Sequence, residues 1–239
     1  MRNWNRLPAE AAAIFVLAAS AAGRTLGGML PFASGMARTF AGELAALALS
    51  MGILAGCGYR RYPYLRVRGA RRADALPICV GALLLLSVSA LCAMRWSPAA
   101  SDEPVWSMLL FGVLLIPAAE ECLFRGLFLT LLEPVSPAFA VALQSVWFAL
   151  CHTGWSGRLY AGAAGAVFGA LCVRTGSLLP GLLLHMGCNA LAALSTVLLR
   201  NGLHAAADVV FAVCWLSALA GVLAHICHYY KRKKKHENQ

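Results

Sequence analysis

Apolar stretches constrain this chain more than any other feature, because each is close to the roughly 20 residues that a helix needs to cross a bilayer. Of the 239 residues, 60% are hydrophobic and only 13% are charged, whereas soluble domains carry about 25% charged residues. The ordinary soluble classes are therefore excluded. The sequence predicts an all-helical, polytopic membrane bundle of about eight transmembrane helices. They are expected at residues 9–31, 37–58, 77–95, 105–132, 136–153, 158–175, 178–199 and 208–229.

Positive charge is concentrated outside these stretches. The net charge is +10, and basic residues gather between 60 and 72 and again at 231–235. Such clusters stay on the cytoplasmic side of a membrane and attract anionic lipid headgroups. The loop 96–104 carries Asp102 and Glu103 and no Lys or Arg. The pattern predicts a multi-pass protein of the cell membrane with both termini in the cytoplasm, and no nucleic-acid partner.

The chain is expected to form one domain. Residues 1–230 are predicted to be a single transmembrane domain with its motif core at 105–200, and residues 231–239 a basic cytoplasmic tail. Nine cysteines are present, but none forms a C-x-x-C pair. A zinc ribbon or a redox motif is therefore not indicated.

The first apolar stretch has two interpretations. Arg2 and Arg6 precede an apolar run that ends in small residues, which is typical of a signal peptide. Apolar character resumes beyond Arg24, whose side chain is expected to snorkel to the membrane surface. This continuation favours an uncleaved helix.

Charged residues lie deep in the fourth apolar stretch, at Glu120, Glu121 and Arg125. Each charge at a helix centre costs about 3 kcal/mol on insertion scales. Glu121 and Arg125 are four residues apart and can pair, so a structural ion pair explains both. Glu120 lies about 100° around the helix from Glu121. It is expected to find a partner on another helix or to serve proton chemistry. Pro117, three residues earlier, is expected to loosen the backbone there.

Two later stretches supply further polar residues. His152 is predicted at the end of the fifth helix, one turn after Phe148, where a lone histidine is most often interfacial. His185 and Asn189 are four apart and share one face of the seventh helix. Taken alone, they could be interhelical hydrogen-bonding residues.

Together, these side chains indicate hydrolysis. Bundles build sites by directing polar side chains from several helices into one cavity. Glu120, His152 and His185 could bind zinc and leave a position open for water. A carboxylate and histidines can also activate water without a metal, while an Asn or His donates to the oxyanion. The residues leave zinc and no cofactor as open alternatives.

The ordered set Glu-Glu-x-x-x-Arg, Phe-x-x-x-His and His-x-x-x-Asn resembles the CPBP family of intramembrane proteases. That family includes the type II CAAX prenyl endopeptidases and the bacterial Abi proteins. The resemblance implies that Glu120 and His152 activate the attacking water. It implies that His185 and Asn189 stabilise the oxyanion or orient the peptide. Supporting roles then fall to Glu121, Arg125 and Phe148.

The expected activity is therefore cleavage of a membrane-embedded or lipid-modified peptide, in contact with the lipid bilayer. By family analogy, the task could be bacteriocin maturation, self-immunity or trimming of a membrane anchor. An ion- or proton-coupled transporter is the rival class, although the sequence shows no internal repeat of the kind common in transporters. A non-enzymatic self-immunity protein is a third class. The sequence does not decide the substrate, the cleavage position or the oligomeric state.

Overall fold

A computed structural model describes residues 8–32, 34–59 and 103–214, together with positions 216, 217, 219, 220 and 223. Every regular element in these residues is helical, which confirms the all-helical class. Five helices are long and apolar enough to cross a membrane, which agrees with a multi-pass membrane protein. They are Ala9–Gly28 (α1), Gly35–Gly56 (α2), the continuous helix Val105–Leu132, Trp155–Thr175 (α8) and Leu179–Arg200 (α9). Pro137–Leu150 (α7) and His204–Cys214 are shorter apolar helices.

Several sequence predictions fall on other parts of the chain. The expected helix 77–95, the basic loop at 60–72 and the tail 231–239 lie outside the described residues. The last predicted helix, 208–229, is described only in part, and its first turn begins earlier, at His204. The count of eight helices and the cytoplasmic position of the termini therefore stay predictions.

Some predicted boundaries were wrong, for local reasons. The first helix ends at Gly28 instead of residue 31, just ahead of Pro31. The second begins at Gly35 because the Ser34 hydroxyl accepts a hydrogen bond from the amide of Ala37 (3.1 Å), which caps that end. The fifth stops at Leu150.

The turn after α7 explains the last of these differences. Gly154 has φ +70°, a left-handed conformation that glycine adopts at little cost. The chain reverses there, and α8 begins at Trp155 instead of residue 158. His152 therefore lies in this turn. The prediction had placed it at the end of the fifth helix.

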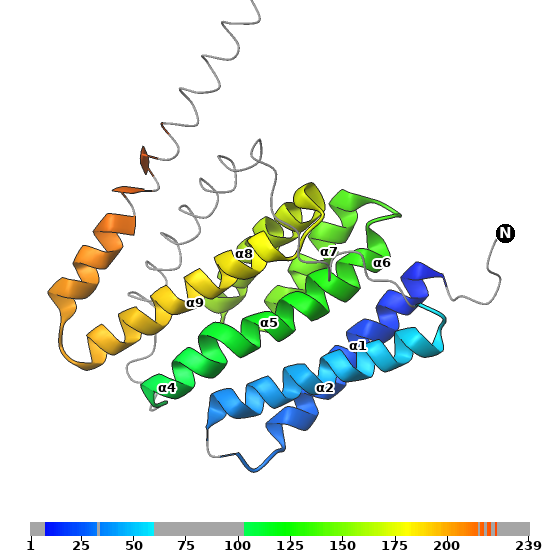
Figure 1. The fold of residues 1–239 in the computed structure, drawn as a ribbon, viewed down its shortest axis with the longest axis horizontal. Helices are drawn as coiled ribbons and strands as arrows, with labels where there is room; N and C mark the ends of the chain where they lie inside the picture. The colour runs from blue at the N-terminus through cyan, green and yellow to red at the C-terminus, as the bar shows by residue number, and fades with distance from the viewer. Residues whose placement is uncertain are drawn as a thin grey trace, which may run out of the picture.

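The helix Val105–Leu132 runs through the centre of the bundle (Figure 1). α1 and α2 lie side by side and antiparallel along one flank, and α9 lies along the other. α7 and α8 form a second antiparallel pair that packs on the C-terminal half of the central helix. The burial of that half, including Phe124, Leu127 and Phe128, follows from this central position.

Small residues bring the paired helices close together. A Cβ atom on Gly23 would overlap the backbone of Ala46, and one on Gly27 would overlap Gly42, so α1 and α2 touch backbone to backbone. A Cβ on Gly165 of α8 would lie 3.1 Å from the Cα of Ser145 in α7. Such contacts are the usual basis of helix association in lipid, where no hydrophobic effect drives helices together.

The central helix is not a regular α-helix. Its segments are Val105–Ser107 (α4), Met108–Leu115 (η3), Ile116–Glu121 (α5), Cys122–Leu129 (η4) and Thr130–Leu132 (α6). The two η segments are π-helical, with hydrogen bonds reaching back five residues. Widened turns of this kind occur often at functional sites. The two glutamates stand in the α-helical turn between them.

Glu103 joins three helix ends at one side of the bundle. Its carboxylate accepts hydrogen bonds from the hydroxyls of Ser34 (2.7 Å) and Ser107 (2.8 Å) and from the amide of Met36 (3.1 Å). Its carbonyl accepts from Arg200 at the end of α9 (2.9 Å). Burial raises the pKa of Glu103, but these hydrogen bonds outweigh it and lower the pKa below its usual value. These contacts fix how far α2, α9 and the central helix are shifted along their axes relative to one another.

Candidate active site

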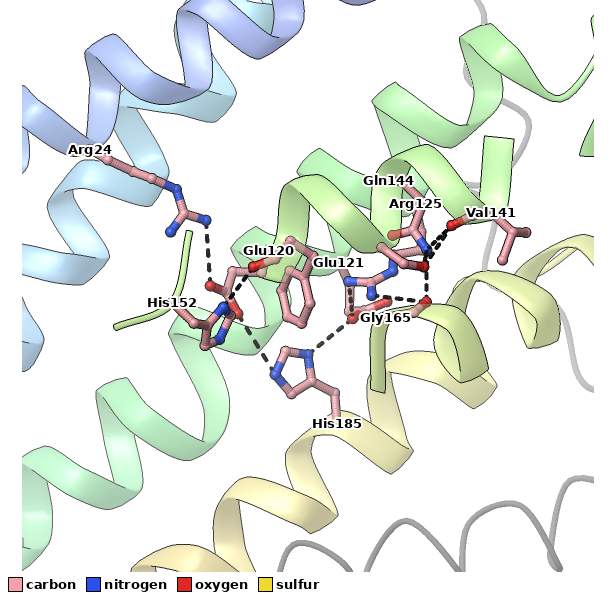
Figure 2. A network of polar contacts seen from close by, with 11 residues as sticks. Arg24, Glu120, Glu121, Arg125, Val141, Gln144, His152, Gly165 and His185 are labelled. Carbon is pink, nitrogen blue, oxygen red and sulfur yellow. Dashed lines mark hydrogen bonds and ion pairs between the residues drawn. The ribbon is translucent and has the colours of Figure 1, made fainter. Parts of the chain in front are cut away.

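One cavity in the bundle collects the predicted catalytic side chains. It has a volume of about 440 Å³ and is lined by Glu120, His152, His185 and Asn189. Glu120 comes from α5, His152 from the turn after α7, and the other two from α9. Figure 2 shows the two histidines and Glu120 turned toward one another from these separate elements. The structure therefore brings together residues that lie up to 69 positions apart in the sequence (120 to 189).

The predicted pair of Glu121 and Arg125 is present and fully buried. Arg125 Nη1 lies 2.9 Å from Glu121 Oε1, and the side chains are 0% and 1% exposed. Arg125 Nη2 also donates to the carbonyl of Gly165 (3.4 Å). The guanidinium lies over the rings of Phe148 (4.5 Å) and Phe168 (5.2 Å), a favourable cation–π arrangement. The pair therefore ties the central helix to α7 and α8.

His185 is oriented by its neighbours on both sides. Its Nδ1 lies 3.0 Å from Glu121 Oε1, and its Nε2 lies 3.7 Å from Glu120 Oε2. The ring stacks on Phe168, with centroids 4.9 Å apart. Because a carboxylate only accepts hydrogen bonds, the Nδ1 atom must carry a proton. The Nε2 atom therefore faces the cavity beside Glu120.

His152 is held by the backbone of its own turn. Its Nδ1 lies 2.7 Å from the carbonyl oxygen of Phe148. A carbonyl oxygen cannot donate, so Nδ1 is the donor, and in a neutral ring Nε2 is the acceptor. Arg158 Nε donates to the carbonyl of His152 (3.0 Å), which holds the turn against α8. His152 can thus accept a proton from a group in the cavity.

Glu120 has weaker contacts than the other buried carboxylates. Its Oε1 lies 3.5 Å from Arg24 Nη2, its Oε2 lies 3.7 Å from His185 Nε2, and the side chain is 6% exposed. Glu121, by contrast, has close partners in Arg125 and His185. A buried carboxylate without a tight partner is suited to exchange protons with a substrate water.

Sequence reasoning missed two residues of this site. Arg24 was expected to snorkel to the membrane surface, but its side chain is only 20% exposed and turns into the bundle. Its Nη2 lies 2.8 Å from Glu43 Oε1, and the Glu43 side chain is 0% exposed. Glu43 is the one acidic residue of its apolar stretch. The cost of inserting a charge into the membrane, which identified Glu120 as a candidate, could have identified Glu43 as well.

Asn189 is positioned by an irregularity in the central helix. The amide of Ile116 donates to the carbonyl of Phe111, five residues earlier. The next bond of this pattern would run from residue 117 to Gly112, but Pro117 has no N–H. Asn189 Nδ2 donates to the carbonyl of Gly112 instead (2.8 Å). Pro117 thus leaves free the acceptor that holds Asn189 at the cavity.

We expect Pro117→Ala to loosen Asn189. The new backbone N–H would compete for the Gly112 carbonyl, which Asn189 now uses. If Asn189 takes part in turnover, the rate should fall by roughly 3- to 10-fold, the equivalent of about 1 kcal/mol for one hydrogen bond. Combining Pro117→Ala with Asn189→Ala should add little beyond Asn189→Ala alone. Fully additive losses would show that the proline acts elsewhere.

The sequence left open a zinc site at Glu120, His152 and His185. Among the residues that the structure describes, no three His, Cys, Asp or Glu side chains converge closely enough to hold a metal ion. Both histidines use Nδ1 in contacts with protein atoms, Glu121 for His185 and the carbonyl of Phe148 for His152.

Comparison with known proteins agrees with this geometry. Residues 102–191 match the family model of the type II CAAX prenyl endopeptidase Rce1-like proteins. The match supports a relation of this part of the chain to the CPBP/CAAX protease family. At the level of the family, the match supports a CAAX-type intramembrane protease. No curated protein and no solved structure matches the chain. All the motif residues lie inside the matched segment, whereas Arg24 and Glu43 lie outside it.

Proposed function

We propose that this protein is an intramembrane endopeptidase that cleaves a membrane-embedded or lipid-anchored peptide with a water activated by Glu120 and His152. One observation carries the proposal: a carboxylate, two imidazoles and an amide line a single cavity inside a membrane bundle. Phe148, Phe168 and Ala164 complete much of its wall and suit an apolar substrate. These residues supply the groups that peptide hydrolysis needs.

Glu120 is the proposed general base. An ionised carboxylate must reach the attacking water, and Glu120 presents Oε2 to the cavity beside His185. His152 offers an unprotonated Nε2 that orients the same water and shares its proton. The water then adds to the substrate carbonyl, and the proton passes to the leaving amine. Both groups are restored when the two products leave.

His185 and Asn189 are the proposed donors to the oxyanion. In a protonated ring of His185, Nε2 is a donor while Glu121 accepts from Nδ1. Asn189 uses one amide hydrogen on Gly112 and retains a second. Buried donors fixed in this way stabilise a developing negative charge strongly.

Comparative membrane proteomics tests the function without a known substrate. Cells carrying the wild type are compared with cells carrying Glu120→Gln, and peptides with new termini are sought. Glu133→Gln, at the end of the same helix, is the matched control. The proposal expects termini that appear with the wild type and with Glu133→Gln but not with Glu120→Gln. If all three samples share the same termini, no cleavage depends on Glu120 and the proposal fails.

A further inference from the structure

Arg24 occupies a precise place between two helices. The glycine contacts at Gly23 and Gly27 press α1 against α2, so the intervening Arg24 meets Glu43 next to Gly42. Its guanidinium then extends from this helix pair to the central helix. Figure 2 shows the Arg24 side chain reaching from α1 to the carboxylate of Glu120.

The contacts of Arg24 are unequal. Nη2 forms an ion pair with the buried Glu43 carboxylate at 2.8 Å and donates a hydrogen bond to Glu120 Oε1 at 3.5 Å. The guanidinium also lies over the ring of Phe124, 5.6 Å from its centroid. The ion pair with Glu43 holds the arginine beside the central helix, and the hydrogen bond directs it at one oxygen of Glu120. The second oxygen, Oε2, stays directed at His185.

We propose that Arg24, clamped by Glu43, is a positioning residue for Glu120. It restrains Oε1 so that Oε2 faces the water, and it balances the negative charge of a carboxylate in a nearly dry site. This inference rests on the proposed function. It extends the working site to α1 and α2, two helices that the family match at 102–191 does not include.

A different role for the same arginine gives a different result. A second cavity of about 390 Å³ adjoins the first and shares Arg24, Thr39 and Cys151 with it. Arg38 also lines this second cavity. If Arg24 instead bound a substrate carboxylate there, its loss would raise the KM for a free-acid peptide but not for the C-terminal amide.

The kinetic experiment uses the full chain in lipid and the peptide with the strongest Glu120-dependent cleavage in the proteomic comparison. The peptide is made as the free acid and as the amide. Arg24→Gln should lower kcat roughly 10- to 100-fold for both forms, as expected for loss of a charge-assisted contact, with KM changed by less than about 3-fold. Arg24→Lys, which keeps the charge, should recover part of kcat. A rise in KM for the free acid alone would overturn the positioning role.

Glu43→Gln and Arg38→Gln complete the kinetic series. Glu43→Gln removes the clamp and should lower kcat in the same way. The double variant Arg24→Gln/Glu43→Gln should lose little more than Arg24→Gln alone, because the two residues act as one unit. Arg38→Gln is the matched control, since this half-exposed arginine donates to the carbonyl of Phe32 and lies outside the contacts of Arg24 with Glu43 and Glu120. An equal loss of kcat in Arg38→Gln would contradict a specific role for Arg24.

A second measurement needs no substrate. Thermal unfolding in detergent is compared for Arg24→Gln, Glu120→Gln and the double variant. A direct contact predicts that the double variant loses clearly less Tm than the sum of the single losses. Additive losses would overturn the inference whatever the enzyme cleaves. Coupling without any Glu120-dependent cleavage would instead refute the proposed function and leave Arg24 with a structural role only.

Discussion

Glu120→Gln is expected to yield a folded, membrane-inserted protein with activity lower by at least about 100-fold, the lower end of what general-base catalysis contributes. The amide keeps the volume of the side chain and can still contact Arg24 and His185, but it cannot accept the proton of the water. The measurement is the cleavage rate of a peptide from the proteomic comparison by purified protein in lipid.

His152→Ala should act at the same step. The double variant should therefore lose little more than either single variant, because members of a catalytic unit are not additive. Glu133→Gln should cut at the wild-type rate and match it in Tm. If purified Glu120→Gln cuts at the wild-type rate, Glu120 is not the base and the assignment of roles fails.

Arg125→Ala is expected to have the largest effect on stability. It removes the guanidinium from a pair that is almost wholly buried and leaves Glu121 without its closest charged partner. Breaking a buried pair costs about 3–5 kcal/mol. The contact with Gly165 and the packing on Phe148 are lost as well. We expect a lower protein level, a lower Tm in detergent and reduced activity.

Two variants sharpen this prediction. Arg174→Ala, in the exposed last turn of α8, is the matched control and should change Tm little. Arg125→Lys keeps the charge but cannot reproduce the planar guanidinium that touches Glu121, Gly165 and the aromatic rings, so it should rescue only partly. Unchanged Tm and accumulation in Arg125→Ala would show that the pair is absent or hydrated in the native membrane.

The two adjacent glutamates illustrate how position assigns chemistry. Glu121 faces Arg125, one turn away on the same helix, and also meets His185. Glu120 points to a different side, where its partners come from α1 and α9 at longer distances. The first carboxylate has close partners on its own helix and on α9. The second has longer contacts, in line with its proposed role as proton acceptor.

The sequence by itself determined what depends on local spacing. The lengths of the apolar stretches predicted the class of protein, and the span 105–132 matches the observed central helix. The spacing of four predicted the pair of Glu121 and Arg125, because residues one turn apart share a helix face. The order of the motifs on separate helices indicated the protease family, which the match at 102–191 supports.

Relations between helices were decided only by the tertiary structure. Arg24 could turn either to the membrane surface or to the interior, and the close packing of Gly23 and Gly27 on α2 places it beside Glu43. His152 lies in a turn and not at the end of the predicted helix, because Gly154 reverses the chain two residues later. Asn189 donates a hydrogen bond to the carbonyl of Gly112, which Pro117 leaves without an amide donor on the central helix. Spacing along the chain fixes contacts within a helix, whereas the crossing and relative level of two helices depend on packing between distant residues.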